Sequence, residues 1–127
     1  MKPLTKAEER VMQVLWKIEK GFLKEIIENS PDPKPHSNTI ATIINILIEK
    51  GYVEYETHGR NNLYWSRLSK DEYGKRIIDQ LVKGYFEGSP FKLMLHLLSH
   101  HKLTADELEE LMKQIRLEKN NSNNKFT

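Results

Sequence analysis

Apolar positions at helical spacing dominate the start of the chain. Thr5 and Glu8 have the spacing of a capping box, in which a hydroxyl and a carboxylate each bind a free backbone N–H group. From Val11 to Ile18, apolar residues then recur every three or four positions. The pattern predicts an amphipathic helix that opens at Thr5 and ends at Gly21.

Two further helices flank a proline-rich loop. A short helix over 24–29 places its isoleucines inward, and the three prolines within 30–35 break regular structure. The next helix runs from Ser37, as its N-cap, to Lys50. Its apolar stripe comprises Ile40, Ile43, Ile44, Leu47 and Ile48.

The polar face of this third helix is unusual. A solvated helix normally carries Lys and Glu there, whereas this face carries short and mostly neutral side chains. Such side chains let a helix approach another surface closely, and hydroxyls and amides both donate and accept hydrogen bonds. They are Asn38, Thr39, Ala41, Thr42 and Asn45.

After Gly51 the hydrophobic period changes from helix to strand. Two β-prone runs, 52–56 and 63–67, are joined by the polar, partly basic residues 57–62 and predict a hairpin. In the order helix, helix, helix, hairpin, the second and third helices form a helix-turn-helix and the hairpin forms a wing. The predicted fold is mainly α with a small β-hairpin wing, a winged helix-turn-helix over residues 1–68.

The second half of the chain is helical. Capping boxes at Ser69 and Thr104 and the pair Ser89-Pro90 open three helices. Three helices are too few for a core of their own, so their large apolar residues predict a homodimer with residues 69–119 as dimerisation domain. The polar tail 120–127 is predicted to be disordered. The expected dimer contacts are Ile78, Leu81, Tyr85, Phe91, Leu95, Leu98, Leu108, Leu111, Met112 and Ile115.

The amino-acid composition excludes more classes of protein than the net charge does. The 127 residues include no cysteine, which excludes disulfides and thiol nucleophiles, and no apolar run approaches the ~20 residues of a membrane span. We expect a soluble cytoplasmic protein. The net charge is +2, with eleven basic and nine acidic residues up to Lys70 and nine of each afterwards. This balance permits nucleic-acid binding without requiring it.

Motifs for catalysis and cofactors are absent from the sequence. There is no G-x-S-x-G elbow, phosphate loop or H-E-x-x-H, so we expect no enzyme, no catalytic residues and no cofactor. His96 and His100 have a spacing compatible with metal ligands, and His101 follows directly. Because no cysteine or suitably spaced carboxylate accompanies them, we interpret them as surface or interface histidines and expect no metal site.

Several segments, in order along the chain, carry a family resemblance. They resemble the penicillinase repressor (BlaI/MecI) family of bacterial winged-helix regulators, over roughly residues 4–119. The matching segments are 4–8, 11–16, 38–44, 47–53, Tyr64 and 108–111.

The resemblance implies a homodimeric repressor of a β-lactam-responsive or related operon. Such a repressor sits on a palindromic DNA operator until a membrane sensor-protease signal removes it, with its third helix in the major groove and its wing beside it. By position, the family's DNA-facing residues correspond to Ser37, Asn38, Thr39, Thr42, Asn45 and Ile46 in the helix and His58, Arg60 and Asn61 in the wing.

Some positions depart from the family pattern. Pro35 or His36 stands where an aromatic residue often precedes the third helix. Ala41 and Ile46 stand where relatives can carry Arg, which removes bidentate reading of guanine. The bond that aligns with the family's Asn–Phe cleavage site is His96–Leu97. The lack of cysteine excludes the copper-responsive branch.

Two alternatives remain open. One is a winged-helix regulator that a small-molecule effector releases from DNA without proteolysis. The other is a winged-helix interaction adaptor that does not bind DNA, which the low net charge and the missing arginines favour.

Overall fold

The computed structural model describes residues 2–100 and 103–121. Its internal contacts divide the chain into two units, residues 1–77 and 78–127. No helix within the described ranges is long and apolar enough to cross a membrane. The assignment of residues 1–68 to DNA binding and 69–119 to dimerisation stays a prediction.

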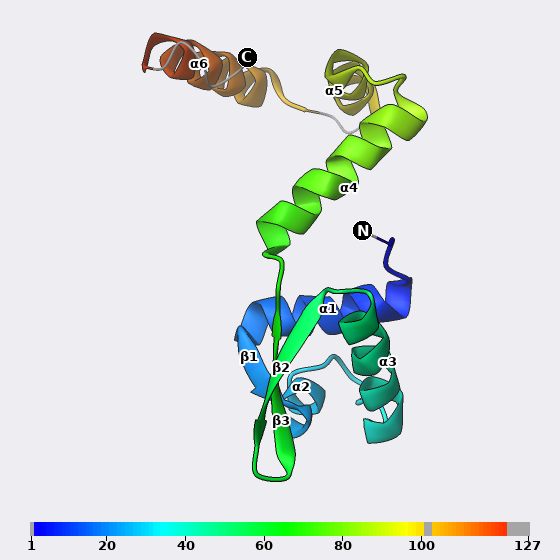
Figure 1. The fold of residues 1–127 in the computed structure, drawn as a ribbon. Coiled ribbons are helices and arrows are strands. Elements are labelled where there is room, and N and C mark those ends of the chain that lie inside the picture. The colour runs from blue at the N-terminus through cyan, green and yellow to red at the C-terminus, as the bar shows by residue number, and fades with distance from the viewer. Residues whose placement is uncertain (1, 101–102, 122–127) are drawn as a thin grey trace. The chain divides into compact units, whose positions relative to one another are not determined.

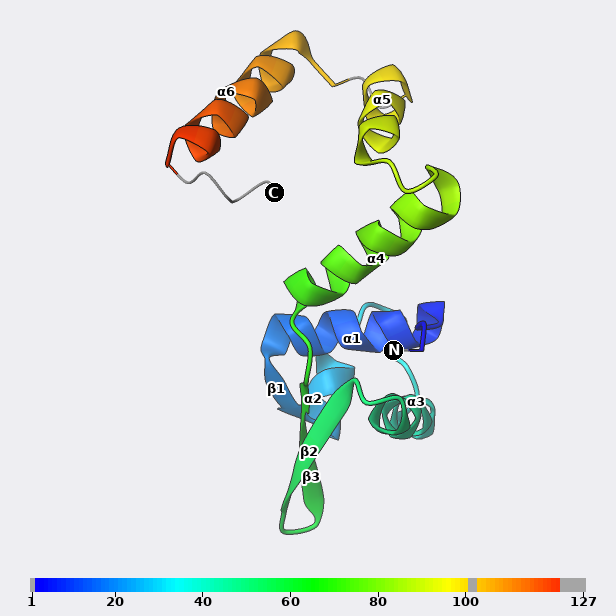
Figure 2. The same cartoon turned by 45° about the horizontal axis from the view of Figure 1, so that its top comes forward.

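The first unit is a winged helix-turn-helix, as predicted (Figure 1). Its elements are α1 (Lys6–Ile18), β1 (Lys20–Phe22), α2 (Leu23–Glu28), α3 (Ser37–Glu49), β2 (Val53–His58) and β3 (Asn61–Ser66). The three strands form an antiparallel sheet in the order β1-β3-β2. α1 contacts α2, α3 and the sheet, and both views show it lying across them (Figures 1 and 2).

The core of this unit is the set of apolar stripes that the helices turn toward one another. α1 contributes the fully buried Met12 and Leu15, α2 contributes Ile26, and α3 contributes Ile44 and Leu47. Burying side chains of this size contributes about 1.5–3 kcal/mol each. The predicted stripe of α3 is thus confirmed as the face that fixes this helix to the domain.

The end of α1 differs from the prediction. The helix stops at Ile18 rather than at Gly21, because Glu19 adopts a left-handed φ of 70° at the C-cap. Gly21 instead lies in the short strand β1, paired with Tyr64 of β3. A Cβ atom on Gly21 would lie 2.6 Å from Ile18 Cδ1, so a larger residue here would require the tip of the Ile18 side chain to move.

The start of α3 and the extent of the hairpin strands also need correction. Ser37 is the first residue of α3 and not its N-cap, which is His36, and no side chain caps this end. The hairpin strands are longer than predicted, with His58 paired to Asn61 across a two-residue turn. Gly59 has a φ of 63° there, which two-residue hairpin turns require of glycine.

The remaining helices begin where predicted. They are α4 (Lys70–Tyr85), α5 (Pro90–His100) and α6 (Ala105–Asn121). Ser69, Ser89 and Thr104 each accept a hydrogen bond from a first-turn N–H group, at 3.0, 3.2 and 3.1 Å. α6 continues through Asn120 and Asn121, which were predicted to be disordered, and the rest of the predicted tail lies outside the described residues.

Candidate nucleic-acid interface

The face of α3 turned away from the core is open. All six helix residues predicted to contact DNA are exposed, while the opposite side of the helix is buried. The six are Ser37, Asn38, Thr39, Thr42, Asn45 and Ile46. α3 therefore presents hydroxyls, amides and methyl groups, with no charged side chain before Glu49.

Thr42 has a more restricted chemistry than its residue type implies. Its hydroxyl donates to the Asn38 carbonyl oxygen at 2.9 Å, within the same helix. The hydroxyl proton is therefore not available to a ligand, and Thr42 presents its methyl group and the free lone pairs of its oxygen. A methyl group packs against thymine, and a lone pair accepts from an adenine or cytosine amino group.

The N-terminus of α3 carries free backbone donors. Because His36 makes no side-chain cap bond, the N–H groups of the first turn have no side-chain partner among residues 2–100 and 103–121. The helix dipole places partial positive charge at the same end. A phosphate is a suitable ligand for such a helix end.

One groove joins this helix end to the wing. It has a volume of about 390 Å³ and is lined by residues of α2, the start of α3 and the wing, among them Lys24, Ser37 and Asn61. The structure thus brings together two predicted site residues, Ser37 and Asn61, with a cation that sequence reasoning missed. Lys24 is the only basic residue of its helix, which is the signal that could have identified it.

The wing supplies a second cation. Arg60 lies in the exposed turn, and within residues 2–100 and 103–121 neither it nor Lys24 forms an ion pair. His58 is occupied, because its Nε2 lies 3.3 Å from Glu56 Oε1 and its ring meets Phe22 edge-on. Arg60 is accordingly the wing residue best suited to a phosphate.

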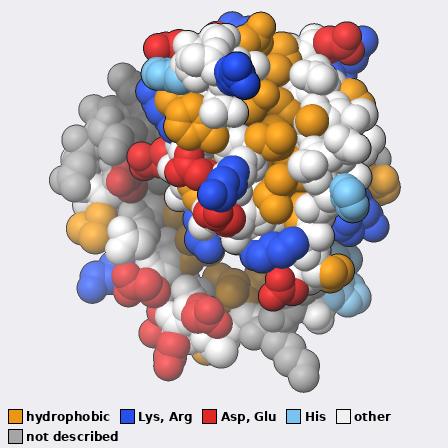
Figure 3. Space-filling model, turned by 90° about the horizontal axis from the view of Figure 1, so that it is seen from below, with side chains coloured by type: hydrophobic (Ala, Val, Ile, Leu, Met, Phe, Trp, Pro, Cys, Tyr) orange, Lys and Arg blue, Asp and Glu red, His pale blue; other side chains and the backbone are white. Residues whose placement is uncertain are grey.

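Most other basic side chains near the wing are already engaged. Lys34 donates to backbone carbonyls at the end of α2, Arg67 pairs with Glu54 at 3.2 Å, and Lys20 lies over the Trp65 ring. Figure 3 looks at the molecule from below, and on that face the Lys and Arg side chains are scattered, with Asp and Glu side chains beside several of them. Binding here would depend on few phosphate contacts.

A buried ion pair holds the far end of α3. Lys50, the C-cap residue, places its Nζ 2.5 Å from Glu8 Oε1, and both side chains are largely buried. Burial acts to raise the pKa of Glu8, but the Lys50 ammonium and the Thr5 donors hold that pKa below its ordinary value. The capping box of α1 and the end of α3 are therefore one connected structure.

The C-terminal unit exposes large apolar side chains. Of the ten residues predicted to form the dimer contact, Leu98 is half-buried and the other nine are exposed, with Tyr85 at 81% and Phe91 at 69%. An isolated chain would leave this surface to water, which is unfavourable.

The predicted cleavage bond lies inside α5. His96 is exposed, Leu97 is half-buried, and the His96 ring contacts those of Phe86 and His100 at 5.5 and 4.5 Å. Among the described residues no group of three potential ligands gathers around a metal position, and His101 lies outside that part of the chain.

Comparisons of the sequence with known proteins identify one family. The sequence model of the family described as penicillinase repressor matches residues 4–117. The penicillinase repressor of Bacillus licheniformis is 25% identical over 118 residues, which cover 92% of each chain. The methicillin resistance regulatory protein MecI of Staphylococcus aureus is 26% identical over 109 residues, 85% of this chain and 89% of that protein. The solution structure of the DNA-binding domain of the repressor BlaI matches 57% of this chain and 94% of that domain, at 31% identity and a TM-score of 0.49.

Proposed function

Because the chain belongs to the penicillinase repressor family, whose members are DNA-binding transcriptional repressors and not enzymes, we propose that it binds a palindromic operator as a homodimer. The observation that carries this proposal is the exposed face of α3, whose short neutral side chains stand opposite a fully buried stripe. Each protomer inserts α3 into the major groove of one half-site.

Base reading is assigned to the middle of α3. Thr39, Thr42 and Asn45 contact base edges, with Asn38 and Ile46 at the borders of the contact. Since the Thr42 proton is held by Asn38, Thr42 reads through its methyl group and its lone pairs. Without arginine on this face, the operator is recognised through thymine methyls and adenine edges more than through guanine.

Two substitutions test the Thr42 assignment. Thr42→Ala removes both groups and should weaken operator binding by about 1–3 kcal/mol, with much less effect on random DNA. Thr42→Ser keeps the hydroxyl and removes the methyl, so it isolates the thymine contact. Equal losses on both DNAs would exclude Thr42 from base reading.

Phosphate contacts are assigned to the groove and the wing. One phosphate is held by Ser37, the free N–H groups of α3 and Lys24. A second phosphate is held across the groove by Arg60 and Asn61. His58 supports the wing through its contact with Glu56. These contacts position the protein and carry no sequence information.

Dimerisation is assigned to the exposed apolar residues of the C-terminal unit. Leu111 and Ile115, one helical turn apart on α6, are both exposed in the single chain. Leu111→Asp places a charge in the proposed contact and should yield a monomer that no longer binds the operator. A stable dimer of this variant in sedimentation experiments would refute the assignment.

Release from DNA is assigned to a sensor-protease signal that cleaves α5 at His96–Leu97. A bond inside a helix is cut only after local unfolding, so we expect cleavage to require opening of α5. Mass spectrometry of the chain recovered from induced cells would identify the cleaved bond, and intact chain after induction would contradict this route.

A small-molecule effector is a second candidate for release. A groove of about 530 Å³, lined largely by apolar side chains, lies between α1, the loop over 30–35 and α3, and Thr39 stands on its wall. A ligand there would contact the helix assigned to DNA. Loss of operator binding by intact chain on adding a metabolite extract would support the effector, and loss only after cleavage would support the protease.

A further inference from the structure

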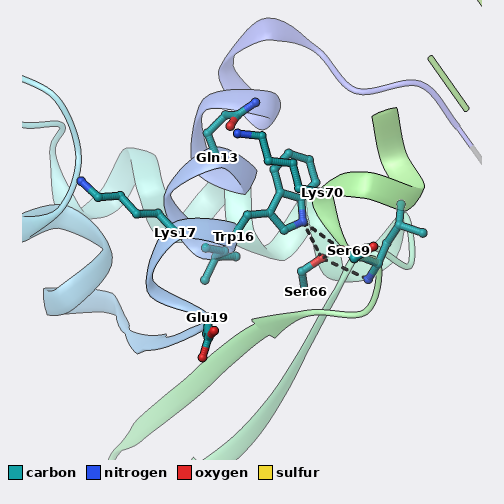
Figure 4. Close-up of a pocket in the computed structure, with 9 residues that line it drawn as sticks. Gln13, Trp16, Lys17, Glu19, Ser66, Ser69 and Lys70 are labelled. Carbon is teal, nitrogen blue, oxygen red and sulfur yellow. Dashed lines mark hydrogen bonds between the residues drawn. The ribbon is translucent and has the colours of Figure 1, made fainter. Parts of the chain in front are cut away.

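The connection between the winged-helix unit and α4 is held by one tryptophan of α1. Trp16 Nε1 donates to the Leu68 carbonyl oxygen at 2.8 Å and to Ser66 Oγ at 3.2 Å, across 52 and 50 positions of sequence. Figure 4 shows the indole nitrogen directed at the segment that joins β3 to α4. A side chain of the first helix therefore bonds to the connection itself.

The connection is well ordered by its own contacts. Leu68 is buried, and its N–H group donates to Ser66 Oγ at 3.1 Å. The Ser66 hydroxyl also bonds the Leu68 carbonyl oxygen, and Ser69 then caps α4. The chain thus enters α4 through a folded turn and not through an open linker.

The first turns of α4 pack on the same tryptophan. The buried Tyr73 ring lies 5.5 Å from that of Trp16 and 6.0 Å from that of Tyr52, measured between ring centroids. Aromatic pairs of this kind have preferred geometries and so define orientation as well as proximity. The start of α4 therefore belongs to the winged-helix unit, in agreement with the division after residue 77.

We propose that Trp16 is a positioning residue, which sets the direction of α4 relative to α3 and thereby the spacing of operator half-sites that the dimer accepts. The second part rests on the proposed function. α4 continues unbroken from Lys70 to Tyr85 and carries exposed apolar residues of the proposed dimer contact in its second half. A change in its direction at Trp16 would move the two α3 helices of a dimer relative to each other.

Replacing Trp16 by Phe should change the direction of α4 relative to α3 and leave the fold intact. Phe keeps an aromatic ring beside Tyr73 and lacks the N–H donor and the five-membered ring of the indole. A groove of about 490 Å³ lies beside Trp16 and is lined by Ser66 and Leu68 among others, so water can reach the acceptors that lose their donor. The polar loss is then one N–H donor, which the Leu68 carbonyl oxygen and Ser66 Oγ share.

Spin labels test the first part of the proposal in the full chain. Because the sequence has no cysteine, Glu49→Cys on α3 and Lys75→Cys on α4 are the only labelled positions, and both residues are exposed. Diluting labelled with unlabelled protein leaves only the distance within one chain. We expect a narrow distance distribution that Trp16→Phe broadens or shifts, whereas Trp65→Phe, which removes an indole bond in the wing, leaves it unchanged. An unchanged distribution in Trp16→Phe would overturn the proposal.

DNA spacing tests the second part. A palindrome selected from randomised DNA by the wild-type chain is rebuilt with spacers one base pair shorter and longer. Trp16→Phe should reduce the preference for the selected spacer about fivefold, the worth of one hydrogen bond, with unchanged affinity for a single half-site. An unchanged spacer preference would overturn this part.

The two assays separate the proposal from the function on which it rests. If the wild-type chain neither dimerises nor selects a palindrome, the proposed function and the spacing role fail together, and the labels still decide whether Trp16 orients α4. If Trp16→Phe fails to fold, Ser66→Ala removes one of the two acceptors and goes through the same assays. Wild-type behaviour of that variant in both would overturn the proposal.

Discussion

Lys24→Gln removes the cation that the groove places beside the start of α3. Lys24 lines the groove at the start of α3, Arg60 lies in the wing turn, and neither forms an ion pair among the described residues, so the proposed phosphate contacts comprise four such cations in a dimer. Each neutralised phosphate contributes about 0.9 to the slope of log K against log salt, so the wild-type slope should be about −3.6. The variant loses two contacts per dimer and should have a slope of about −1.8.

This difference is large enough to measure by fluorescence anisotropy. From about 50 to 200 mM salt, wild-type affinity should fall about 150-fold and that of the variant about 12-fold. The change should be the same on operator and scrambled DNA, because phosphate contacts carry no sequence information. Lys17→Gln removes the same charge from an exposed position of α1 outside the groove and serves as the control. An unchanged slope in Lys24→Gln, or an equal drop in the control, would refute the reasoning.

Two further predictions concern the support and the reading face of α3. Glu8→Gln keeps the capping geometry but removes the ion-pair partner of Lys50, so it should cost about 3 kcal/mol in urea unfolding, and Glu9→Gln should cost much less. Because the pKa of Glu8 is lowered in the folded chain, the stability that its carboxylate contributes is present at neutral pH and is lost as the pH falls through that lowered pKa. Below about pH 4.3, the variant should therefore lose less stability than the wild-type chain. Identical profiles of stability against pH for the two proteins would contradict this. Ile46→Arg adds a guanidinium to the open face of α3 and should enrich guanine in DNA selected from a random pool, whereas an unchanged selected sequence would remove Ile46 from the contact.

The sequence predicted the winged-helix architecture because each helix combines an apolar stripe with a polar cap. It failed where backbone geometry decided the outcome. Glu19 ends α1 in a left-handed conformation that sequence patterns assign to glycine, and the three residues of β1 are too few for a period of two to appear. His36 caps α3 only with its backbone, so Ser37 was mistaken for the cap.

The candidate site was predictable in part for a similar reason. The α3 residues share one helix face and follow from the helical period alone. Lys24 reaches the same region only because α2 folds back beside the start of α3, a tertiary relation that no local pattern carries. The hydrogen bond from the Thr42 hydroxyl to the Asn38 carbonyl oxygen likewise depends on the side-chain rotamer, which the sequence does not specify.

The most direct test of the central claim is a titration of the full chain against the palindrome-containing DNA upstream of its own gene, by fluorescence anisotropy at two salt concentrations, with a scrambled duplex as control. A sequence-specific repressor should bind the palindrome at least about a hundredfold more tightly than the control, and more weakly at the higher salt. Binding no tighter than to the control, repeated with duplexes enriched from randomised DNA, would contradict the account and favour an interaction adaptor.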